Sequence, residues 1–100
     1  MNLLLKRVVL SCTCFLVLST HAMADPMEDA KLSYAEGRYA SALKLLTPLA
    51  RNGNVSAQHL LGEMYANGQG VSQSYKEALK WYHLAAEQGD ANAQFELGMM

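Results

Sequence analysis

Two pairs of histidine and glutamate stand four residues apart and could supply metal ligands. They are His59 with Glu63, and His83 with Glu87. Residues four apart share one face of a helix, so either pair could bind a metal if other residues completed the site. A solvated helical pair is the simpler interpretation of such a spacing. We therefore predict no metal site.

The sequence carries no constellation typical of catalysis. A G-x-S-x-G nucleophile motif is absent, and no lysine follows Gly68-Gln69-Gly70 at the spacing of a phosphate-binding loop. We interpret this glycine segment as a turn. The only cysteines, Cys12 and Cys14, lie in a segment that we expect to be removed. The sequence therefore predicts a protein that is not an enzyme and has no cofactor.

Length and composition limit the remaining classes of protein. The chain has 100 residues, of which 51% are hydrophobic and 17% are charged, with a formal net charge of −1. This length allows one small domain at most. The near-neutral charge argues against a nucleic-acid partner, because such proteins usually carry a strong basic excess.

Residues 1–24 have the pattern of a secretory signal peptide. Lys6 and Arg7 precede an uncharged, mostly apolar stretch at residues 8–20, and Ala22-Met23-Ala24 is a small-x-small cleavage site. The apolar stretch is too short to cross a bilayer, so we expect no stable membrane insertion after cleavage. The sequence predicts export to the periplasm, with secretion as the alternative. Residues 25–100 would then fold without a disulfide bond.

An internal repeat is the strongest pattern in the sequence. A series of residues recurs 36 positions later in the chain. So many identical residues at a single spacing, in so short a chain, are not chance. The first set is Tyr39, Ala42, Leu43, Lys44, Ala50, Gly53, Ala57, Gln58, Leu61, Gly62 and Met64; the second is Tyr75, Ala78, Leu79, Lys80, Ala86, Gly89, Ala93, Gln94, Leu97, Gly98 and Met100.

The repeated unit is predicted to be a pair of helices. Apolar residues at three- and four-residue spacing mark the inner face of each helix. Ser74 and Glu77 form a capping box, Gly68 and Gly89 favour helix ends, and Asp90 can cap the next helix. The predicted inner faces are Ala57, Leu60, Leu61, Met64 and Tyr65 in the first helix, and Tyr75, Ala78, Leu79, Tyr82, Ala85 and Ala86 in the second.

Glycine inside the first helix of the unit indicates a close helix contact. Gly62 costs about 1 kcal/mol relative to alanine at such a position, so a packing reason is expected. It returns as Gly98 at the same phase. Trp81 is expected to pack between helices rather than to hold a ligand. An earlier, shorter unit joins its two helices through Gly37-Arg38 alone, which is tetratricopeptide-like geometry.

These residues resemble the Sel-one-like repeat family, a branch of the tetratricopeptide superfamily. The match runs from Ala57-Gln58-x-x-Leu61-Gly62 through Gly68-x-Gly70 to Trp81-Tyr82-x-x-Ala85-Ala86-x-x-Gly89, and restarts at Ala93-Gln94. The resemblance implies an all-α fold, a right-handed α-solenoid of antiparallel helix pairs. We expect a short unit at about 27–53, a full unit at about 54–89 and an incomplete unit at 90–100.

The resemblance also implies a function in binding. Such proteins usually act as adaptors for a protein or peptide, and exported members often serve envelope signalling or assembly. The first helix of each pair faces the concave groove, which selects as candidate binding residues Ser56, His59, Glu63, Asn67, Asn92, Phe95 and Met99. An alternative is a β-lactam-binding or hydrolysing enzyme, as in a disulfide-rich branch of the family, although the predicted mature chain has no cysteine.

The incomplete last unit leaves a further alternative. Ala93, Leu97 and Met100 form an apolar stripe that the absent partner helix would cover. Either the chain is a fragment of a longer repeat array, or this stripe binds a partner or a second copy.

Overall fold

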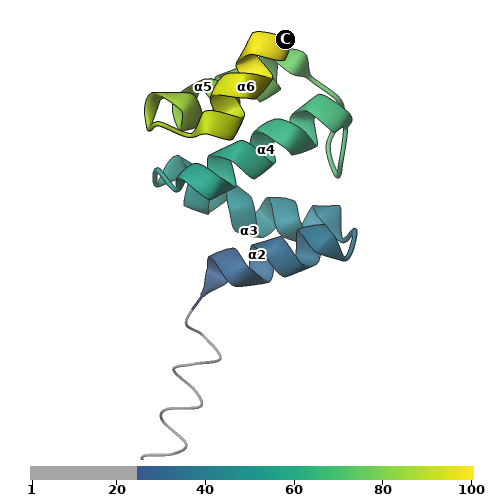
Figure 1. The fold of residues 1–100 in the computed structure, drawn as a ribbon. Coiled ribbons are helices and arrows are strands. Elements are labelled where there is room, and N and C mark those ends of the chain that lie inside the picture. The colour runs from purple at the N-terminus through teal and green to yellow at the C-terminus, as the bar shows by residue number, and fades with distance from the viewer. Residues whose placement is uncertain (1–24) are drawn as a thin grey trace, which may run out of the picture.

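The computed structural model of the chain describes residues 25–100 (Figure 1). The predicted signal peptide, residues 1–24, lies outside the described residues. Within residues 25–100, no helix is both long and apolar enough to cross a membrane.

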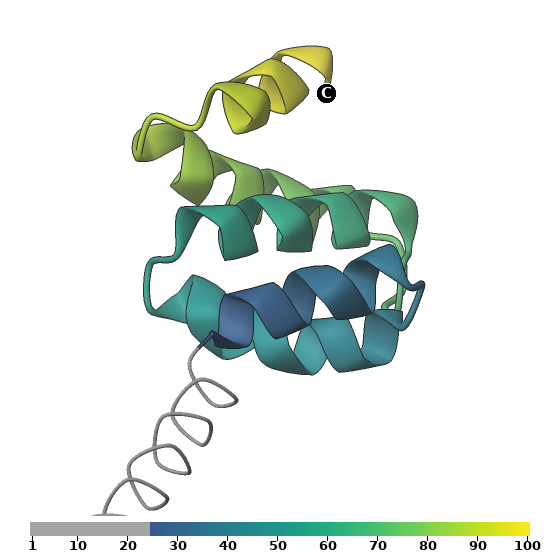
Figure 2. The ribbon, with the colours of Figure 1, turned by 60° about the horizontal axis from the view of Figure 1, so that its bottom comes forward.

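Residues 25–100 form five helices that pack in sequence order as antiparallel pairs (Figures 1 and 2). Each helix packs chiefly on the next along the chain, so α2 lies at one end of the stack and α6 at the other. The all-helical repeat fold predicted from the sequence is thus confirmed. The helices are α2 (Pro26–Ala35), α3 (Tyr39–Arg51), α4 (Val55–Asn67), α5 (Tyr75–Glu87) and α6 (Ala91–Met99).

Short polar side chains start the helices where the sequence predicts them. The Ser74 hydroxyl accepts a hydrogen bond from the backbone N–H of Glu77 at 3.2 Å. The Asp90 carboxylate accepts from the backbone N–H of Ala93 at 3.0 Å. These bonds satisfy donors that the first helical turn leaves without an intrahelical partner. The helix ends therefore follow from local sequence.

Alanine dominates the core and sets the close spacing of the helices. One cluster joins α2, α3, α4 and Trp81 of α5, and a second joins α5 to α6. Small side chains let helix backbones approach, while Leu46, Leu61, Met64 and Tyr82 fill the remaining volume. Trp81 is buried in the first cluster, which confirms that it packs between helices.

Gly62 lies at a close contact between α4 and α5. A Cβ atom built on it would lie 2.5 Å from Cδ1 of Tyr82, which is closer than non-bonded carbon atoms approach each other. The predicted packing reason for this glycine is therefore confirmed. The expectation does not extend to Gly98, because a Cβ there would meet no atom within 4 Å.

The predicted inner face of α5 is wrong for Tyr75 and Leu79. Ala78, Tyr82 and Ala85 are buried, but Tyr75 and Leu79 are exposed and lie with Met99 at one shallow depression. The repeat equivalent of Tyr75, Tyr39, is partly covered by the loop at Gly70, where φ is +75° and an added Cβ would lie only 2.9 Å from the Cβ of Tyr39. No described loop covers Tyr75 in the same way.

Candidate functional site

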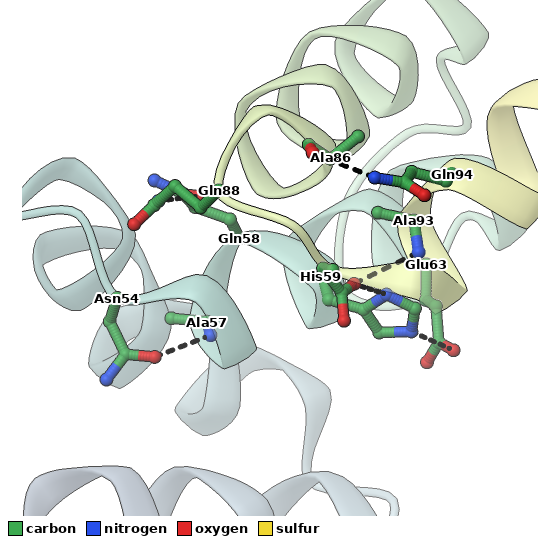
Figure 3. Close-up of polar contacts among 10 residues, drawn as sticks. Asn54, Ala57, Gln58, His59, Glu63, Ala86, Gln88, Ala93 and Gln94 are labelled. Atoms are coloured by element: carbon green, nitrogen blue, oxygen red, sulfur yellow. Dashed lines mark hydrogen bonds and ion pairs between the residues drawn. The ribbon is translucent and has the colours of Figure 1, made fainter.

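The candidate site is built on one face of α4. Asn54 starts this helix by accepting a hydrogen bond from the backbone N–H of Ala57 at 2.9 Å (Figure 3). His59 and Glu63 follow one turn apart and project to the same side of the helix (Figure 3). The sequence therefore fixes the separation of these two side chains through the backbone of α4.

His59 lies between two carboxylates. Its Nε2 atom is 3.1 Å from Oε1 of Glu63 (Figure 3). Its Nδ1 atom is 3.1 Å from Oδ2 of Asp90. Asp90 is also the N-cap of α6, so this contact ties α4 to the start of α6. The side chains of His59, Glu63 and Asp90 are mostly covered, with exposed fractions of 17%, 31% and 21%.

The donors and acceptors of the side chains decide which of these contacts can be hydrogen bonds. A carboxylate oxygen only accepts, and a neutral imidazole has one N–H donor. Both contacts of His59 can be hydrogen bonds at once when the ring carries two N–H groups. Each ring nitrogen of His59 therefore faces a carboxylate oxygen, Nε2 toward Glu63 and Nδ1 toward Asp90. The sequence-based interpretation of His59 and Glu63 as a solvated pair is wrong, because Asp90 covers the other side of the ring.

Tyr34 of α2 extends this arrangement across a third helix. Its hydroxyl lies 3.1 Å from Oε2 of Glu63 and 3.1 Å from Oε1 of Gln69, and it donates to one of them at a time. Burial, and then the charge of Glu63, raise the pKa of Tyr34. We call the connected set Tyr34, His59, Glu63, Gln69 and Asp90 the α4 network.

Tyr82 forms the floor beside the α4 network. Its ring centroid is 5.7 Å from that of His59, and the ring packs against Gly62. Burial raises the pKa of Tyr82, and the charges of Glu96 and Glu63 raise it further. The tyrosine therefore stays protonated beside the histidine at neutral pH.

The structure separates the predicted binding residues into two groups. His59 and Glu63 meet in the α4 network. The other five are exposed and take no part in it: Ser56, Asn67, Asn92, Phe95 and Met99. In repeat register, Phe95 and Met99 of α6 occupy the positions of His59 and Glu63 in α4. None of the seven is thereby shown to bind a partner.

Several residues of the arrangement were missed from sequence. Tyr34 contacts both Glu63 and Gln69, and only the fold brings them together, because more than 25 positions separate Tyr34 from either residue. Asp90 was predicted only as a helix cap. The repeated Ala-Gln dipeptide could have indicated that each glutamine bonds to the preceding helix. The Gln58 side chain donates to the Ala50 carbonyl at 3.1 Å. Gln94 donates to the Ala86 carbonyl at 3.3 Å (Figure 3).

His83 and Glu87 behave as the sequence predicts. Nε2 of His83 lies 3.4 Å from Oε1 of Glu87, and both side chains are exposed. Within residues 25–100, no group of three or more His, Cys, Asp or Glu side chains has an arrangement that could hold a metal ion. The absence of a bound metal or cofactor stays a prediction.

The stacked helix pairs and their recurring caps and glutamine bonds define a helical-repeat protein. Comparison with known families makes this specific: the family described as Sel1 repeat matches residues 55–90. The chain therefore contains a Sel1 repeat, as the sequence resemblance predicted, and α4 with α5 form it. Such repeats typically mediate protein interactions. No curated protein matches the chain.

Proposed function

We propose that this protein is an exported adaptor that binds a protein or peptide partner and performs no catalysis. The binding surface consists of the side of α4 that carries His59 and the corresponding side of α6. Export to the periplasm rests on the sequence pattern of residues 1–24 alone. A role in envelope signalling or assembly is the expectation that the family resemblance adds.

The exposure of Phe95 and Met99 carries this proposal. These two apolar side chains are 66% and 71% exposed, although their repeat equivalents in α4 are largely covered. Exposed large apolar side chains beside polar groups are typical of surfaces that bind a partner. The α4 network is polar and held by tertiary contacts. The proposed surface thus combines apolar anchors on α6 with a positioned set of hydrogen-bonding groups on α4.

Site-specific photocrosslinking tests the binding surface. A photoreactive phenylalanine analogue at position 95 retains the aromatic ring and is used in the cell that makes the protein. We expect one discrete protein product at position 95, reduced at least fivefold by Met99→Glu. The same analogue at the exposed Lys44 of α3 is the matched control and should not give this product.

Two results would contradict the proposal. One is the same set of products from positions 95 and 44, which would mean collisional labelling. The other is a product at position 95 that Met99→Glu leaves unchanged. A product with the mass of two copies of this chain would replace the heterologous partner with self-association. Fractionation of the same cells tests export separately, since a cytoplasmic product of full length would contradict it.

A further inference from the structure

A cavity on another side of the stack holds groups that the α4 network does not use. It lies between α3, α4 and α5 and has a volume of about 390 Å³. This volume is within the usual range of small-ligand sites, roughly 300–1,000 Å³. Gln58, Leu61 and Tyr65 of α4 line it, and they lie roughly 150° around that helix from His59 and Glu63. The cavity is therefore separate from the proposed partner surface.

Two cations stand at the cavity. Arg51, the last residue of α3, and Lys80 of α5 both line it. Neither belongs to an ion pair within residues 25–100. Glu77 also lines the cavity, so the three charged side chains sum to +1. The site therefore has an excess of positive charge that one monovalent anion would neutralise.

The cavity belongs to the basic half of the repeat domain. Helices α3 and α5, with the N-cap of α3, carry most of the basic residues of the described chain but only two acidic ones, Glu77 and Glu87. The basic residues are Arg38, Lys44, Arg51, Lys76 and Lys80. This excess would favour approach of an anion to the α3–α5 side.

Trp81 gives the cavity an apolar wall. Leu84 of α5 adds further apolar lining, and the Lys80 ammonium lies 5.4 Å from the centroid of the Trp81 ring. The indole N–H of Trp81 is buried without an acceptor in the described part of the chain. A buried donor of this kind is costly, and a ligand acceptor that reached it would relieve the cost.

We propose that this cavity binds a carboxylate attached to an aliphatic group, of the kind that the free C-terminus of a peptide presents. Arg51 and Lys80 would bind the carboxylate, and the aliphatic group would lie against Trp81 and Leu84. A carboxylate fits better than a phosphate because the three charged side chains sum to +1, whereas a phosphate monoester carries about −1.5 to −2 at pH 7. Arginine matches a planar carboxylate through paired hydrogen bonds.

The single tryptophan of the chain makes the test direct, because Trp81 lines the cavity and no other indole contributes to the signal. The protein, purified in the form that accumulates in cells, is titrated with N-acetyl-leucine and with N-acetyl-leucinamide, which lacks the charge. Fluorescence and the single indole N–H resonance are the readouts. We expect the acid to bind saturably with a Kd of about 1–10 mM, the weak affinity typical of so small a ligand. The Kd of the amide should be at least tenfold higher.

Variants on one helix provide the control. Lys80→Gln and Arg51→Gln should each weaken binding of the acid at least fivefold. Lys76→Gln removes an exposed lysine one turn from Lys80 that does not line the cavity, and it should change binding less than twofold. Thermal unfolding of each variant verifies that these exposed substitutions leave the fold intact.

The source of the carboxylate is decided by a second pair of ligands. A pentapeptide ending in leucine, with a free or amidated C-terminus, should bind more tightly than N-acetyl-leucine only in its free form. Tighter binding of the amino-acid derivative would assign the site to a small carboxylic acid instead. Equal binding of acid and amide, equal losses in Lys76→Gln and Lys80→Gln, or stronger competition by inorganic phosphate would each overturn the proposal.

Discussion

Helices α4 and α6 carry the same sequence motif but stand in different surroundings. Helix α4 packs between α3 and α5, whereas the main contact of α6 is with α5. Residues at equivalent positions can therefore be compared with local sequence held nearly constant. The compared pairs are Asn54 and Asp90, Ala57 and Ala93, Gln58 and Gln94, Leu61 and Leu97, and Gly62 and Gly98.

Local features are the same in both helices. Asn54 and Asp90 each accept a hydrogen bond from the backbone N–H three residues later. Ala57 and Ala93 are both fully buried. Each glutamine bonds a carbonyl of the preceding helix. These features are the same because their partners lie within the cap itself or on the preceding helix.

Features that need a following helix differ. Gly62 is pressed against Tyr82, whereas Gly98 faces open space. Leu61 is fully buried and Leu97 is not. The comparison teaches that the motif determines backbone and caps, while the next helix determines burial. Exposed apolar residues on α6 are thus positions at which a covering surface is absent from the described chain.

The largest expected difference is between the two leucines. Leu61→Ala should lower the free energy of unfolding by about 2–5 kcal/mol, since it leaves a cavity in a fully packed core. Leu97→Ala should cost about 1 kcal/mol, because part of its side chain is already in water. Urea unfolding followed by circular dichroism measures both. Equal losses would show that α6 is packed as tightly as α4.

The two glycines should respond with opposite signs. Gly62→Ala should destabilise by about 1–3 kcal/mol because the new Cβ overlaps the Tyr82 ring. Gly98→Ala should stabilise by up to about 1 kcal/mol through helix propensity, since nothing obstructs its Cβ. Thermal unfolding of the two variants is the measurement. Destabilisation by Gly98→Ala would mean that another surface packs on it.

The two glutamines should differ by a smaller amount. Gln58 is 4% exposed, donates to the Ala50 carbonyl and accepts from Gln88 at 2.9 Å. Gln58→Ala should cost about 1–2 kcal/mol, because buried partners lose their hydrogen bonds. Gln94→Ala should cost less than about 0.5 kcal/mol, because water replaces its exposed bond. Urea unfolding of the two variants under the same conditions is the measurement. Coinciding unfolding midpoints for Gln58→Ala and Gln94→Ala would contradict this difference.

The smallest effect at neutral pH is expected for the Tyr82 hydroxyl. Burial raises the pKa of Tyr82 in the folded chain above the value of about 10 in the unfolded chain. The unfolded chain therefore loses its phenol proton first, and the free energy of unfolding should fall as the pH rises above about 10. Tyr82→Phe should flatten this fall in unfolding experiments between pH 8 and 11. Tyr75→Phe, at an exposed tyrosine, is the control and should leave the slope unchanged.

Sequence reasoning predicted the parts that depend on local chemistry. Helix periodicity, the caps at Ser74 and Asp90, and the 36-residue repeat define the fold, since each acts over a few residues or through identical units. The exposure of Tyr75 and Leu79 could not be predicted, because it depends on a covering segment rather than on α5. The contacts of Tyr34 with Glu63 and of His59 with Asp90 join distant segments, which no short motif records.

Hydrogen exchange compares the two helices most directly. Mass spectrometry after peptic digestion follows the amides of residues 60–63 in α4 and the equivalent residues 96–99 in α6 under native conditions. The central claim, that a following helix and not the motif sets burial, predicts exchange through global unfolding in α4. It predicts exchange at least a hundredfold faster in α6, through local opening. Equal protection of the two segments would contradict this claim and would show that α6 is covered in solution.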